Sequence, residues 1–294
     1  MANHKLYITD VYTNRTYKGK SVAVVKIDQE ETEETMKNLA GELEQAETTF
    51  VRQLDKEIYE VRSFTPHKEL AVSACASIAS FWVLADQDFI EPLYKGEKEV
   101  LEISKSGRIQ VFLDYDKYKI QGVRLILPYT EEARAQDLDG EGLDLLGLKE
   151  EDLGLGSRDL GPVEGLGIQG LNIPLRTHDL VKNLDYDKEA LAAYLRDKPW
   201  GTLRVYSLEG EKILQKTLQI KEGVDEEKPL GLASASLLKY LYDLDLISGS
   251  QLEIIERHKE NRLCRLQGQV LEETGGRVSL SGQAAISIEG VIRG

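Results

Sequence analysis

The chain has 294 residues, with 37 Lys and Arg against 51 Asp and Glu, a formal net charge of −14 and 41% hydrophobic residues. This length is typical of two domains that each bury a core, and the acidic balance excludes a general basic surface for nucleic acid. We therefore expect no nucleic acid among its partners. Since no apolar run is long enough to span a bilayer, we expect no membrane among them either.

The cysteine content indicates a reducing compartment. Cys75 and Cys264 are too few for a disulfide framework, and the four histidines are dispersed without the Cys or His spacing that zinc requires. The N-terminal segment also lacks the apolar stretch of a signal peptide. We therefore expect a cytoplasmic protein without a bound metal.

The first half of the sequence predicts strands alternating with two helices. Residues 33–47 place apolar side chains at helical spacing on one face, which predicts a surface helix ending near Glu47. Residues 71–86 are almost wholly apolar or small, which predicts a buried helix, with an N-terminus open to close approach by an anion. Strands are predicted where β-branched and aromatic residues alternate or cluster, over 6–13, 21–27, 48–54, 57–64, 101–115 as a hairpin, and 122–129.

The second half repeats this order after a Leu-, Gly- and acid-rich connection over 131–170, in which a short helix is predicted near 150–155. A small-residue helix over 230–244 corresponds to the buried helix of the first half. Such a repeat suggests two like domains with a cleft between them. The other predicted elements are a strand over 170–175, a helix over 187–197, a hairpin over 202–220, a strand over 262–273 and a closing strand pair over 277–283 and 284–292.

Glu47 is the first candidate for chemistry. It lies in A-E-T-T-F-V, between a predicted helix and a predicted strand. A carboxylate held at such a junction can act as a general acid or base when burial tunes its pKa. A solvated glutamate at a helix end is the alternative interpretation.

The segments around Glu47 resemble the PhzF-like family, named for phenazine biosynthesis. AETTFV is similar to the family's S-E-T-A-F-V, ITDVYTNRTYKGKSVAVV to V-D-A-F-T-x-x-x-F-x-G-N-P-A-A-V-V, and VRSFTPHKEL to R-x-F-T-P-x-x-E-L. Later, GVDEEKPLGLASASLL lies where the family has G-x-x-E-D-P-x-T-G-S-A, and RVSLSGQAAISIEGVI resembles the closing strand pair. The order and spacing of these segments extend the resemblance along the whole chain.

The resemblance implies an α+β fold like that of diaminopimelate epimerase: two pseudo-symmetric domains, each a mostly antiparallel sheet wrapped around a central helix. We expect domains over 1–128 and 129–294, with the closing strands over 277–294 able to pack back on the first. The family implies a homodimer, no metal or organic cofactor, and a small carboxylic acid as substrate, on which a proton is moved.

Carried over by position, the family's catalytic Glu is Glu47, and its Gly-His pair falls on Ala74 and Cys75, beside Ser73. The Asp before Pro falls on Lys228. The Gly-Ser pair that helps to hold substrate falls on Leu232 and Ala233, where the side chain of Leu232 would narrow the site.

These substitutions leave two functions open. In the first, the chain is a PhzF-like isomerase or epimerase in which Glu47 moves the proton, assisted by the thiol of Cys75 or the charge of Lys228. In the second, it is a catalytically reduced member that binds a small ligand or a partner. Cys75 can equally be a small buried core residue.

Overall fold

The computed structural model describes residues 3–127, 138–154, 170–198, 200, 202–219, 225–226, 231–249, 251–257 and 262–293. Two compact units account for the chain. The first contains Met1–Pro128, Arg262–Leu266 and Ser279–Gly294, and the second contains Tyr129–Asn261 and Gln267–Val278. The C-terminal strand thus belongs to the first unit.

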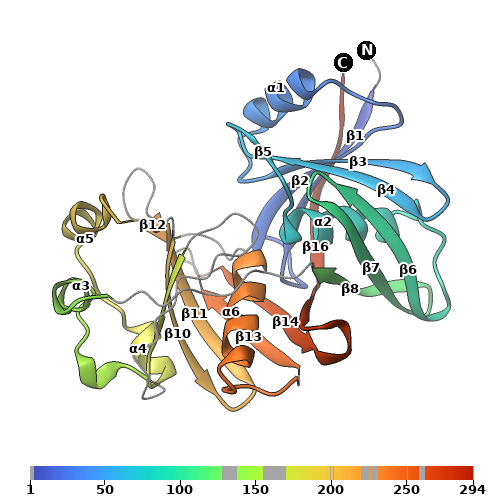
Figure 1. The fold of residues 1–294 in the computed structure, drawn as a ribbon. Helices are drawn as coiled ribbons and strands as arrows, with labels where there is room; N and C mark the ends of the chain where they lie inside the picture. The colour runs from blue at the N-terminus through green and yellow to red at the C-terminus, as the bar shows by residue number, and fades with distance from the viewer. Residues whose placement is uncertain are drawn as a thin grey trace. The chain divides into compact units, whose positions relative to one another are not determined.

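The first unit is a sheet wrapped around one helix, α2. Its strands follow the order β16-β1-β2-β3-β4-β6-β7-β8, and α2 contacts β16 at one end of this path as well as β8 at the other (Figure 1). Strands far apart in this order therefore meet the same helix. The elements are β1 (His4–Val11), β2 (Lys20–Lys26), α1 (Glu33–Leu43), β3 (Thr48–Asp55), β4 (Ile58–Phe64), β5 (Glu69–Leu70), α2 (Ala74–Asp86), β6 (Lys95–Ser104), β7 (Gly107–Asp116), β8 (Lys119–Leu127) and β16 (Ala284–Ile292).

Residue size explains why α2 is central while α1 is peripheral. Alanine, serine and cysteine dominate the first half of α2, and the helix is buried nearly all round, so strands approach it closely. In α1 only Met36 and Ala40 are buried, and they pack with Phe50 and Phe64 on β3 and β4. The helix α1 is therefore the one-sided surface helix that its sequence predicts.

The second unit contains β9, β10, β11 and β13 in one sheet, with more helices than the first. Its elements are α3 (Gly140–Leu145), a 3-10 helix (Glu150–Asp152), β9 (Gly170–Pro174), α4 (His178–Lys182), α5 (Lys188–Leu195), β10 (Thr202–Glu209), β11 (Lys212–Gln219), β12 (Asp225–Glu226), α6 (Gly231–Asp243) and β13 (Leu252–Arg257). Between β13 and β16 lie β14 (Leu263–Leu271), a second 3-10 helix (Glu272–Thr274) and β15 (Arg277–Gly282). The division between the units falls within β14 and β15.

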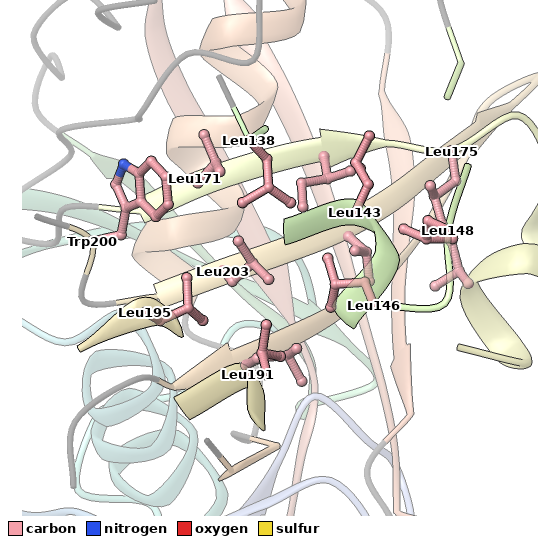
Figure 2. Close-up of a cluster of buried hydrophobic side chains, with 14 of the residues drawn as sticks. Leu138, Leu143, Leu146, Leu148, Leu171, Leu175, Leu191, Leu195, Trp200 and Leu203 are labelled. Carbon is pink, nitrogen blue, oxygen red and sulfur yellow. The ribbon is translucent and has the colours of Figure 1, made fainter. Parts of the chain in front are cut away.

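A leucine-rich core covers one face of this second sheet. Leu203 of β10 points into it, together with side chains from α3, α5 and β9 (Figure 2). Val205 of β10 belongs to the same cluster. Arg204, which alternates with them, is also buried but hydrogen-bonds to α6 instead. Strand β10 is thus covered on both faces, as a central strand between helices should be.

The two units share one strand plan. In the first, β2–β3 and β4–β6 are parallel pairs that flank the antiparallel pair β3–β4. In the second, β9–β10 and β11–β13 are parallel and flank the antiparallel pair β10–β11. The connections β4-α2-β6 and β11-α6-β13 are equivalent, because parallel neighbours need a crossover that a helix supplies. This repeat matches the predicted α+β fold with two like halves.

Candidate functional site

The N-terminus of α2 is the first part of the candidate site. Ser73 caps this helix in an extended conformation, and its Oγ accepts a hydrogen bond of 3.2 Å from the backbone N–H of Ala76. Ala74 and Cys75 form the first turn, and each is only 1% exposed. Small side chains at this turn allow the loop before β3 to lie close to the helix.

Glu47 does not end a helix, contrary to the prediction from the sequence. Helix α1 stops at Leu43, because Glu44 adopts a left-handed conformation with φ of 48°, and Glu47 lies in the following loop, directly before β3. Its carbonyl oxygen accepts a 2.9 Å hydrogen bond from the N–H of Ala23 on β2. The backbone of Glu47 is therefore fixed by the sheet rather than by the helix.

Glu47 is buried, at 4% exposure, and its carboxylate has two donors, one on each oxygen. Lys20 Nζ donates to Oε1, and Ser73 Oγ donates to Oε2. Lys20 is equally buried, so the two opposite charges compensate each other where water is excluded. The structure thus brings two of the predicted site residues, Glu47 and Ser73, into direct contact.

Lys20 was not predicted from the sequence as a site residue. It opens β2 directly after Gly19, whose φ is 62° and where an added Cβ would lie 2.1 Å from the carbonyl oxygen of Val11. This turn requires glycine, and it delivers the lysine to Glu47. The quoted family segment contains G-N-P where this chain has Gly19-Lys20-Ser21, so the lysine in place of asparagine was the available signal.

Cys75 lies against a second residue that sequence reasoning missed, Tyr12. The thiol of Cys75 donates to Tyr12 Oη at 3.6 Å, and both side chains are buried. Burial, followed by the neighbouring Cys75 and Glu47, holds the pKa of Tyr12 well above its ordinary value. Tyr12 therefore remains a neutral phenol, and its φ of 63° is one of the strained backbone conformations of this unit.

The remaining predicted residues belong to the second unit or lie outside the described residues. Leu232 and Ala233 are in the first turn of α6 and are buried, at 6% and 5% exposure. The carbonyl oxygen of Ala233 accepts a 2.5 Å hydrogen bond from Arg204 Nη1. Lys228 lies outside the described residues.

The described ranges contain neither a cluster of metal ligands nor a membrane-spanning helix. No group of three or more His, Cys, Asp or Glu side chains there could hold a metal ion. No helix in the same part of the chain is long and apolar enough to cross a membrane.

Comparison with known proteins gives consistent matches. The sequence model of the PhzC-PhzF family, described as phenazine biosynthesis-like protein, matches residues 9–290. An uncharacterized isomerase of Pseudomonas aeruginosa is 28% identical over 288 residues, which are 97% of this chain and 96% of that protein.

Solved structures show the same fold. A PhzF-family protein of Enterococcus faecalis aligns with a TM-score of 0.76 at 21% identity, over 99% of this chain and 100% of that one. A hydroxyproline epimerase of Agrobacterium vitis, solved with bound trans-4-hydroxy-L-proline, aligns with a TM-score of 0.62 at 10% identity, over 99% of this chain and 92% of that one. At these identities the likeness concerns the fold.

Proposed function

This chain belongs to the PhzC-PhzF family of phenazine biosynthesis-like proteins, and from that premise we propose that it is an isomerase or epimerase that moves a proton on a small carboxylic acid. Glu47 is the acid/base residue in this proposal. A relative over nearly the whole chain is named an isomerase. A protein of the same fold, the hydroxyproline epimerase, binds a small amino acid.

The observation that carries the proposal is the buried, charge-compensated carboxylate of Glu47. A carboxylate has about four acceptor positions, so the bonds from Lys20 and Ser73 leave capacity for a third contact. A carbon-bound proton next to the substrate's carboxylate could be taken up there and returned at another position. The Lys20 ammonium would offset the negative charge that develops near the site.

The other predicted site residues have subordinate roles in this proposal. Cys75 and Lys228 are the proposed assisting groups, and Ser73, Ala74, Leu232 and Ala233 are proposed to line the substrate site. Homodimerisation, a cytoplasmic location and independence from cofactors stay predictions.

A second function is favoured by the same contacts. Both oxygens of Glu47 are already engaged, and Leu232 is buried at the start of α6. A protein that keeps the scaffold to bind a small ligand, without turning it over, would also have these features.

Exchange of carbon-bound hydrogen with deuterated water separates the two functions. A panel of amino acids and related carboxylates is incubated with the wild type, with Glu47→Gln and with Glu42→Gln, which changes an exposed carboxylate on α1. We expect the wild type and Glu42→Gln to catalyse exchange into at least one compound, and Glu47→Gln to be slower by about 10²-fold or more. Equal exchange by Glu47→Gln, or none by the wild type, would contradict the proposal.

A further inference from the structure

Glu102 is a buried carboxyl group that the proposed chemistry does not use. It is on β6, is 1% exposed, and faces α2, where Ser77 Oγ lies 2.9 Å from its Oε1. Its other oxygen, Oε2, is buried without a hydrogen-bond partner. Its register neighbours are Tyr59 on β4 and Ile109 on β7, both buried. Carboxyl groups are seldom buried with so few partners unless they are neutral.

The hydroxyl of Ser77 contacts two acceptors at once. Besides Oε1 of Glu102, it lies 3.0 Å from the carbonyl oxygen of Ser73. A serine hydroxyl has one proton to donate. If Glu102 were ionised, Ser77 could donate to only one of the two acceptors, and in the other contact a lone pair of Ser77 Oγ would face a lone pair of the acceptor oxygen. If Glu102 carries a proton, it can donate to Ser77, which then donates to Ser73, and both contacts are satisfied.

The surroundings of Glu102 also favour the form in which its carboxyl group carries a proton. Burial raises the pKa of Glu102 to about 8, against a smaller lowering by the hydrogen bond from Ser77. Of the neighbours named above, Tyr59 is the titratable one, and burial raises its pKa as well. Both groups are therefore neutral near pH 7.

We propose that Glu102 is a neutral carboxylic acid in the folded protein and a positioning residue for Glu47. Through Ser77 it fixes the carbonyl of Ser73, the residue that caps α2 and whose hydroxyl donates to Glu47. The part of this inference that concerns Glu47 rests on the proposed function, whereas the neutral state of Glu102 does not.

The neutral state is tested by the pH dependence of urea unfolding, which needs no substrate. Because the pKa of Glu102 is about 8 when folded and near 4.5 when unfolded, the folded state holds the extra proton between these values, and stability falls as the pH rises through this window. Glu102→Gln cannot ionise. We expect the unfolding constant of the wild type, relative to that of Glu102→Gln, to rise by up to tenfold per pH unit between about pH 5 and about pH 8.

Glu99→Gln, which changes an exposed carboxylate on the same strand, should keep the wild-type pH dependence. Parallel curves for the wild type and Glu102→Gln would overturn the neutral state. If Glu102→Gln does not fold, carbon-13 NMR of glutamate-labelled wild type gives the same answer. We expect a buried glutamate carboxyl signal that titrates near pH 8, and its absence would overturn the proposal.

The positioning role is tested by the exchange assay. We expect the exchange activity of the wild type to decline above about pH 8, as Glu102 ionises. Glu102→Gln should keep exchange activity without this decline, whereas Glu102→Ala should lose most activity at every pH. Equal activity and equal pH profiles in all three proteins would overturn this role. A wild type without any exchange would instead refute the proposed function, and the unfolding result would stand on its own.

Discussion

At the scale of single residues, Lys20 and Glu47 form the buried ion pair of the candidate site. Each side chain is 5% exposed, so neither charge is screened by water. Removing a charge from water costs several kcal/mol, and the partner's opposite charge has to compensate. A buried pair is therefore sensitive to the loss of one member, although replacement of both members can be nearly neutral.

We predict that Lys20→Met destabilises the protein by about 3 to 5 kcal/mol, because it leaves a buried carboxylate uncompensated. The double variant of Lys20→Met and Glu47→Gln should lose much less stability than the sum of the losses in the two single variants, since neither charge then remains. Urea unfolding of the four proteins gives the coupling energy. Additive losses would mean that the two charges do not compensate each other.

At the scale of elements, two helix caps in the first unit allow a matched comparison. Ser73 caps α2 and Thr32 caps α1, and each side chain accepts a backbone N–H three residues later. Only Ser73 also donates to a buried carboxylate. Ser73 therefore has two structural roles where Thr32 has one.

We predict that truncating the two caps to alanine lowers the free energy of unfolding by different amounts. Thr32→Ala should cost about 1 kcal/mol, the usual value of a cap. Ser73→Ala should cost about 3 kcal/mol, since a hydrogen bond to a charged group contributes about 1.5 to 3 kcal/mol in addition. Thermal or urea unfolding measures both. Equal losses would show that the bond from Ser73 to Glu47 contributes little to folding.

Among the elements, the long helices could be predicted from the sequence and the short segments could not. Helices α2 and α6 were predicted because long runs of small and apolar residues leave few alternatives. Helix α4, with five residues, and strand β13 were not predicted, since so short a segment contains little periodicity. The end of α1 was placed too late, because the left-handed turn at Glu44 has no signal in the apolar spacing.

The candidate site was predictable only in part, for a related reason. Glu47 and Ser73 were identified through the family segments and the helix pattern. Lys20 is 27 residues from Glu47, and Tyr12 is 63 residues from Cys75, so their contacts depend on the sheet rather than on local sequence. Glu102 belongs to no recognised motif, and only its contact with Ser77 of α2 in the folded structure reveals it.

At the scale of the whole molecule, the two halves place a glutamate at equivalent positions. Glu102 on β6 pairs in register with Tyr59, and Glu256 on β13 pairs in register with Gln215, in strands that follow α2 and α6 respectively. Their partners differ. Glu256 accepts hydrogen bonds from Gln215 Nε2 at 2.8 Å and from the N–H of Thr217 at 2.9 Å. The repeat thus preserves a position while changing its chemistry.

A buried cation accompanies the glutamate of the second half. Arg204 is 3% exposed and donates to the carbonyl of Ala233 in the first turn of α6. Burial lowers the pKa of Arg204 to about 10, so it stays charged at neutral pH. Burial also raises the pKa of Glu256 to about 7, and hydrogen bonds and the charge of Arg204 limit that rise. Arg204 should therefore couple the start of α6 to the protonation of Glu256.

This coupling predicts a pH-dependent loss for Arg204→Met. Without the cation, the pKa of Glu256 should rise beyond about 7, and the stability of the variant relative to the wild type should therefore continue to fall above that pH. We expect a loss of about 3 kcal/mol near pH 6, typical of an uncompensated buried group, and a larger loss near pH 9. Arg204→Lys, which retains a charge, should lose less and show a weaker dependence on pH. Urea unfolding at both pH values measures this. An equal loss of stability at the two pH values would mean that Arg204 only holds the backbone of α6. Glu256 would then titrate independently of Arg204.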